Sequence, residues 1–122
     1  MKPSATAETP LDLNDILVST EGQFTATVTI ENGQNLSAGA VLGEITGSDW
    51  TLSATGAGDG SEVASAVLAE DCDASGGAKS AIVYFAGRFN ANRLTFGTGH
   101  TADSLRQDFA QRGLFLYDAV PA

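Results

Sequence analysis

The segment VASAVLAEDCDASGGAKSAIVYFAG, residues 63–87, contains two apolar stretches separated by an acidic turn that ends in glycine. The first stretch, residues 63–69, has the length and composition of a β-strand. The second, residues 80–87, is a continuous apolar run, which predicts a strand that is covered on both faces. We therefore expect a β-turn-β element here, with residues 80–87 as the central strand of the fold.

Further strands are expected on both sides of this element. Residues 23–31 alternate between apolar and polar side chains and predict a half-buried strand. The predicted inner face of this strand consists of Phe24, Ala26, Val28 and Ile30. The Asn-Gly pair at residues 32–33 predicts a tight turn, and more strands are expected at residues 39–45, 50–54, 94–96 and 114–120.

One helix is expected near the C-terminus, within residues 101–113. Either Thr101 or Asp103 can cap its first turn. Leu105 and Phe109 are four residues apart and share one face, and Asp108 can pair with Arg112 at the same spacing. The glycine at position 113 predicts the end of the helix. The sequence thus predicts a mainly β domain with one short helix.

Composition and charge limit the class of protein. A chain of 122 residues with 43% hydrophobic residues and 14 glycines suits one turn-rich β domain. Its net charge is −9, and its six basic residues are scattered, so nucleic acid is not an expected partner. No stretch has the length of a transmembrane helix or the apolar core of a secretory signal, so we expect a soluble product made in the cytoplasm.

The acidic turn invites comparison with a calcium loop. Asp71, Asp73, Ser75 and Gly76 match the first, third, fifth and sixth positions of an EF-hand loop. The last position, where such loops carry a bidentate glutamate, is Ile82, and a strand follows instead of a helix. We therefore interpret the turn as a solvated connection.

Catalytic and metal-binding residues are sparse. Cys72 is the only cysteine, so the chain has no internal disulfide, and with one histidine it cannot complete a zinc site. No GxSxG motif exposes a serine nucleophile. We expect no metal, no cofactor and no catalytic residue. The alternative is a small β ligand-binding or hydrolase domain, with a pocket between subunits near His100 and Asp103.

The first twenty residues differ from the rest of the chain. They are small and polar up to Pro10, and the apolar segment LDLNDILV follows. We interpret residues 1–20 as an extended arm and residues 21–122 as the β-rich domain. The candidate binding residues of the arm are Thr6, Ala7, Pro10, Leu11, Leu13, Ile16, Leu17 and Val18.

Four segments, taken in order, resemble the bacteriophage head decoration protein family. They are GQNLSAGAVLGEIT (residues 33–46), DGSEVASAVLAEDCDASGG (59–77), AGRFNANRLTFG (86–97) and DSLRQDFAQRGLFL (103–116). Each segment alone is moderately specific, whereas their order and spacing make the resemblance stronger. The resemblance extends over roughly residues 20–120.

The resemblance implies a structural role without enzymatic activity. It implies a small β-clip-like decoration domain that binds the outer surface of the expanded phage head as a homotrimer. Such a protein is part of the virion and stabilises the shell against the pressure of the packaged DNA. Its partner is the major capsid protein, and the resemblance assigns the contact to the N-terminal arm.

Overall fold

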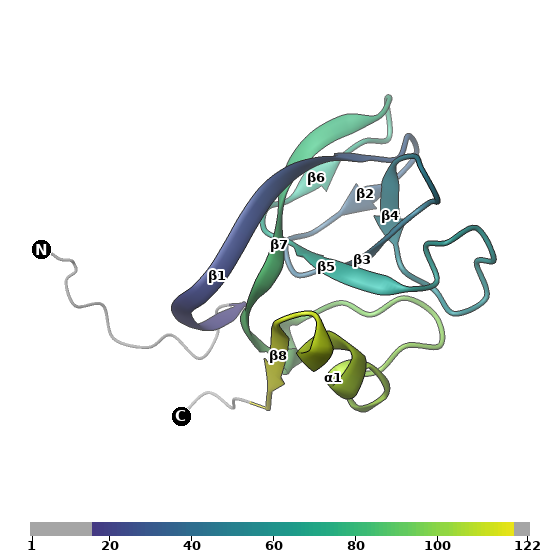
Figure 1. Ribbon diagram of the computed structural model, residues 1–122. Coiled ribbons are helices and arrows are strands. Elements are labelled where there is room, and N and C mark those ends of the chain that lie inside the picture. Colours follow the sequence, from purple (N-terminus) through teal and green to yellow (C-terminus); the bar gives the residue numbers. More distant parts are fainter. Residues whose placement is uncertain (1–15, 119–122) are drawn as a thin grey trace, which may run out of the picture.

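A ladder between two long strands, β1 (Leu17–Ile30) and β7 (Lys79–Asn90), forms the spine of the molecule (Figure 1). The computed structural model describes residues 16–118, except for the side chains at positions 20 and 21. The other strands are β2 (Asn35–Leu36), β3 (Val41–Glu44), β4 (Trp50–Leu52), β5 (Ala64–Leu68), β6 (Cys72–Asp73) and β8 (Leu114–Tyr117). The helical elements are the 3₁₀ turn η1 (Ala91–Arg93) and the helix α1 (Ala102–Gln111).

Five of these strands close into a small barrel. β7 pairs with β1 along one edge and with β5 on the other, and β5 continues through β3 to β4. Trp50 of β4 then pairs in parallel with Ile30 at the end of β1, which closes the ring. β8 extends the sheet by pairing in parallel with the last four residues of β7. The predicted mainly β fold with one helix is confirmed.

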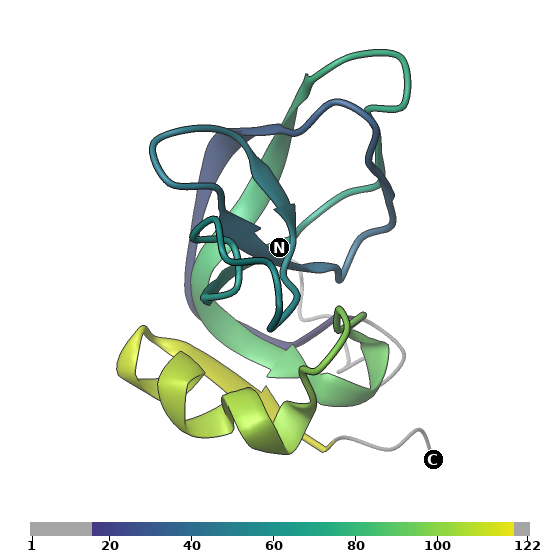
Figure 2. The same ribbon diagram turned by 90° about the vertical axis from the view of Figure 1, so that its right-hand side faces the viewer.

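Two clusters of buried side chains form the core. The first consists of Ile30, Ala40, Leu42, Ala66, Leu68, Cys72, Ala74, Ala81 and Val83. The second consists of Val41, Ala64, Val67, Phe89, Ala91, Leu105, Phe109, Leu114 and Leu116. β3 and β5 send alternate side chains to the two clusters, because successive residues of a strand point to opposite faces. The second cluster lies where α1 and β8 cover one end of the barrel (Figures 1 and 2).

The prediction for residues 80–87 is half right. The strand is central, because β7 pairs with β1, β5 and β8. It is not covered on both faces: Val83 is fully buried, but the neighbouring Ile82 is 43% exposed. The strands covered on both faces are β3 and β5, which lie between the two clusters.

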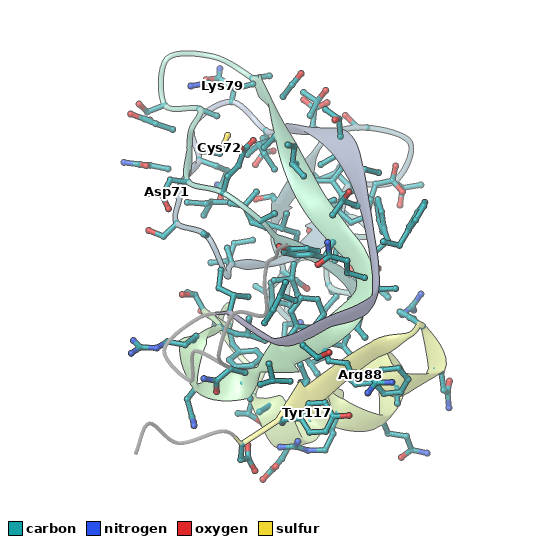
Figure 3. All side chains as sticks on the ribbon, turned by 90° about the vertical axis from the view of Figure 1, so that its left-hand side faces the viewer. Asp71, Cys72, Lys79, Arg88 and Tyr117 are labelled. Atoms are coloured by element: carbon teal, nitrogen blue, oxygen red, sulfur yellow. The ribbon has the colours of Figure 1, made fainter. Side chains whose placement is uncertain are left out.

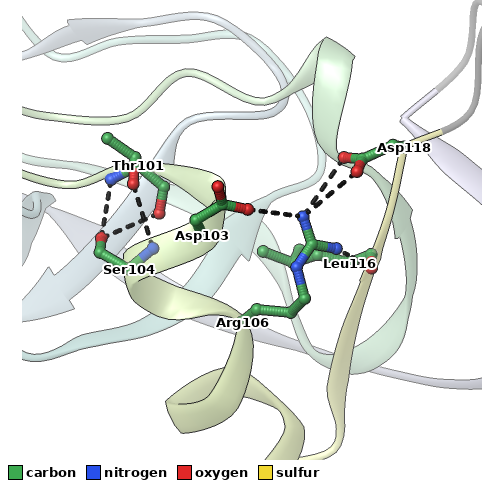
Figure 4. Close-up of polar contacts among 6 residues, drawn as sticks. All are labelled: Thr101, Asp103, Ser104, Arg106, Leu116 and Asp118. Atoms are coloured by element: carbon green, nitrogen blue, oxygen red, sulfur yellow. Dashed lines mark hydrogen bonds and ion pairs between the residues drawn. The ribbon is translucent and has the colours of Figure 1, made fainter.

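The helix begins where the sequence predicts. Thr101 is the N-cap, and its side chain and that of Ser104 accept hydrogen bonds from each other's backbone N–H groups. Leu105 and Phe109 form its buried face. The predicted Asp108–Arg112 pair is wrong, since the ion pairs formed within residues 16–118 belong to Arg106 instead (Figure 4).

Three smaller features differ from the prediction. β2 and β6 form a two-stranded sheet that the pattern of the sequence does not indicate. Residues 94–96 do not form a strand, and only Thr95 makes an isolated bridge, to Ala40. The strand expected at residues 63–69 begins at Ala64 and leaves Val63 46% exposed. No helix within residues 16–118 is long and apolar enough to cross a membrane.

Candidate functional site

The predicted arm joins the domain at the N-terminal end of β1. Ile16, Leu17 and Val18 are half-buried, and the backbone N–H of Asn90 donates to the Ile16 carbonyl over 2.6 Å. Leu17 pairs with Phe89 in the β1–β7 ladder. The other candidate arm residues, Thr6, Ala7, Pro10, Leu11 and Leu13, lie outside the described residues.

The side chains of Ile16 and Leu17 pack against the second core cluster. Ile16 lies beside Gly39, where a Cβ would come within 3.7 Å of the Ile16 side chain and only 2.6 Å from the Arg93 carbonyl. Gly39 also has a φ of +97°, a conformation that side chains other than hydrogen disfavour. The Arg93 carbonyl and the positive φ therefore require glycine at position 39, and the Ile16 side chain packs beside it at an ordinary contact distance.

β1 bulges away from β7 just after this root. From Ser19 to Phe24, β1 advances by five residues, while β7 advances by two, from Arg88 to Ala86. A second register shift lies between Phe24 and Thr25, and it explains why Phe24 is 61% exposed although the alternation places it on the inner face. The alternation of apolar residues does not indicate this bulge, but Gly22, which has a φ of +75°, lies within it, and a glycine inside a strand is typical of a bulge.

The far side of β7 presents two more exposed aromatic side chains. Phe115 and Tyr117 of β8 are 42% and 43% exposed, whereas Leu114 and Leu116, which alternate with them along the strand, are buried. Phe115 pairs with the exposed Arg88 of β7. Figure 3 shows Arg88 and Tyr117 side by side on this side of the molecule. Sequence reasoning missed these residues, because the final strand was expected without an assignment of its two faces.

The tail of the chain is tied to the helix by Arg106 (Figure 4). Its guanidinium donates to the Leu116 carbonyl over 2.7 Å and lies 3.3 Å from carboxylate oxygens of both Asp103 and Asp118. The hydrogen bond to Asp118 is the main cause, and the one to Asp103 the second, of a pKa of Arg106 that is raised above its ordinary value. Asp103, the predicted neighbour of His100, is therefore engaged with Arg106.

His100 contacts a buried serine that the sequence did not single out. Ser53 Oγ lies 3.0 Å from His100 Nε2 and donates to the Ser61 carbonyl over 2.6 Å. A hydroxyl has one proton, and a carbonyl can only accept it, so His100 Nε2 must donate to Ser53. The imidazole therefore does not act as a base toward this hydroxyl. Gly97 lies so close to the Ser53 carbonyl that a Cβ at position 97 would not fit. The Ser53–His100 hydrogen bond therefore ties the loop that carries His100 to the residue that follows β4.

The carboxylates of the acidic turn accept hydrogen bonds from backbone and side-chain groups of the protein. Asp71 accepts from the Ala38 N–H over 2.8 Å, and Glu70 accepts from the Ile82 N–H over 3.0 Å. Asp73 accepts from both the hydroxyl and the N–H of Ser75, which lowers its pKa. Within residues 16–118 no cluster of histidine, cysteine, aspartate or glutamate side chains could hold a metal ion. Cys72 is buried in the first cluster.

The arm root, Arg88 and the exposed residues of β8 thus gather at the C-terminal end of β7. The family model of the bacteriophage lambda head decoration protein D matches residues 6–114. The chain belongs to this family. No match is found among curated proteins. The family match gives this decoration protein a role in decorating the phage head, at the capsid surface of the virion. The family is a structural class and not a class of enzymes.

Proposed function

We propose that this decoration protein binds the outer surface of the expanded head as a homotrimer and that residues 1–20 contact the major capsid protein. The contact stabilises the shell against the pressure of the packaged DNA. The proposal rests on the family match and on the attachment of the arm, whose root is part of the folded domain.

The root of the arm carries the argument. Leu17 is hydrogen-bonded into the β1–β7 ladder, and Ile16 and Leu17 pack into the second core cluster. A force that reaches Ile16 is therefore passed to the barrel through a strand and a packed core. Such a connection suits a protein that holds two neighbouring parts of a shell together.

Binding through an arm has an entropic cost that favours a trimer. Ordering about a dozen residues costs on the order of 10–20 kcal/mol in backbone entropy, so strand pairing and apolar burial must offset this cost. In a trimer, the first bound arm raises the effective concentration of the other two at their sites. Three modest contacts then give tight overall binding.

Removal of residues 1–15 tests the proposal and leaves Ile16 and Leu17 in place. Binding is measured by co-sedimentation with expanded heads of the cognate phage that were assembled without decoration protein. We expect the truncated protein to fold normally and to lose binding to heads. Equal binding of the truncated and full chains would show that the arm is not the contact.

Two further measurements address the finer parts of the proposal. Sedimentation velocity of the free protein and a density map of decorated heads give the number of copies in each unit. Heads decorated with the full chain should retain their DNA at higher temperature than undecorated heads. A monomer on the head, or equal DNA retention, contradicts the respective part.

A further inference from the structure

One face of the sheet beside the arm root combines exposed aromatic side chains with a cation. Phe115 and Tyr117 are two residues apart on β8 and therefore share a face. Arg88 pairs with Phe115 and lies on that same face. Phe24 belongs to it as well, because it pairs with Ala86, two residues before Arg88. We call these four residues, Phe24, Arg88, Phe115 and Tyr117, the aromatic face.

The aromatic face has the composition of a protein-binding surface. Its three aromatic residues are 42–61% exposed and are three of the five large hydrophobic residues that the described chain exposes. None of the ion pairs within residues 16–118 involves Arg88. Aromatic residues and arginine are enriched where protein interfaces are most tightly bound, whereas exposed aromatic clusters are uncommon on free surfaces.

The position of this face identifies its partner. Asn90 binds the Ile16 carbonyl through its N–H and pairs with Tyr117 in the β7–β8 ladder. The arm root and the exposed end of β8 therefore lie at the same end of β7. The aromatic face is thus the part of the domain surface next to the point where the arm leaves the fold.

We infer that the aromatic face docks on the surface of the major capsid protein next to the site that holds the arm. The partner surface presents apolar side chains to Phe115 and Tyr117 and a carboxylate to Arg88. Because none of the ion pairs formed within residues 16–118 uses Arg88, its guanidinium can pair with a carboxylate of the partner. This inference rests on the proposed function and adds a contact from the domain to that of the arm.

The experiment uses the full chain and expanded heads without decoration protein. Phe115→Thr, Tyr117→Thr and Arg88→Glu each remove one part of the aromatic face, and threonine retains a high strand propensity. Ile82→Thr is the matched control, since Ile82 is 43% exposed and lies six residues before Arg88, toward the other end of β7. We expect each of the three variants to bind heads about 5- to 30-fold more weakly, and the control to bind like the unmodified chain.

The outcomes separate this inference from the proposed function. If the truncated chain without residues 1–15 fails to bind while all three variants bind normally, the arm contact stands and the inference is wrong. If the truncated chain binds normally, the proposed function is wrong. Sedimentation velocity of each variant provides the last distinction: variants that dissociate into smaller species would show that the face joins copies of this chain, which also overturns the inference. Circular dichroism confirms that each variant is folded.

Discussion

Two aspartates each accept hydrogen bonds from a serine two residues later in the chain. Asp73 accepts from the hydroxyl and N–H of Ser75, and Asp59 accepts from the same groups of Ser61. In both cases the serine hydroxyl is the main cause of a pKa below the ordinary 3.8. A carboxylate with a lowered folded-state pKa stabilises the fold above its unfolded pKa, and this contribution is lost as the pH falls through the folded-state value.

We expect Ser75→Ala to raise the pKa of Asp73 toward its ordinary value, because the larger of its two hydrogen bonds is removed. Asp59 is the internal control and should titrate as before. The measurement is an NMR titration of the carboxyl carbons between about pH 2 and pH 6. The stability difference between the two proteins should shrink as the pH falls below about 4. An unchanged titration of Asp73 would contradict this assignment.

The Ser53–His100 contact predicts a structural effect and no catalytic one. His100→Ala removes a donor to Ser53, and we expect a loss of about 1 kcal/mol in unfolding free energy. Ser53→Ala should cost more, about 1–3 kcal/mol, because it leaves the Ser61 carbonyl without its hydroxyl donor. Urea denaturation measures both, and binding to heads should remain unchanged in each variant. Loss of head binding by the folded His100→Ala protein would show that His100 belongs to the binding surface.

The first turn of the helix is stabilised by hydrogen bonds at its cap. Thr101 and Ser104 form a reciprocal capping box. We expect Thr101→Ala to lower the unfolding free energy by about 1 kcal/mol, and the double variant with Ser104→Ala to lose less than the sum of the single losses. Chemical denaturation of the four proteins gives this coupling. Ser48→Ala, in an exposed turn, is the control and should change stability by less than about 0.5 kcal/mol. Strictly additive losses would show that the two bonds act independently.

The elements that were predicted correctly are those whose signal is local. The helix has a cap, an i, i+4 apolar pair and a terminal glycine; β3, β4 and β5 are short apolar segments, and the middle of the long strand β7 is a continuous apolar run. β2 and β6 are two residues each and have no periodicity to detect. The exposure of Phe24 depends on register shifts between β1 and β7, which are set by residues more than sixty positions away. The same limit applies to the site: the sequence identified Ile16 and Leu17 as apolar, but their packing against the second cluster depends on β7, where Phe89 pairs with Leu17 and the Asn90 N–H donates to the Ile16 carbonyl.

The molecule as a whole joins a barrel to a layer formed by α1 and β8. β3 and β5 contribute to both buried clusters, so the two clusters share strands and cannot separate without breaking the barrel. β7 extends from the barrel into this layer, where it meets the arm root on one edge and β8 on the other. A load carried by the arm is therefore shared between both parts of the core.

This arrangement predicts that the arm has two separable functions, divided at Ile16. Deleting residues 1–15 should leave the unfolding free energy unchanged, because the truncated chain keeps Ile16 and Leu17, which pack against the second cluster. Deleting residues 1–18 removes these half-buried side chains and the Leu17–Phe89 pair, and we expect a loss of about 1–3 kcal/mol. Both truncated proteins should fail to bind heads, so denaturation and co-sedimentation together separate folding from binding. Equal stability of the two truncated chains would mean that the root is not part of the fold, and a large loss from the shorter deletion would mean that residues 1–15 also support the core.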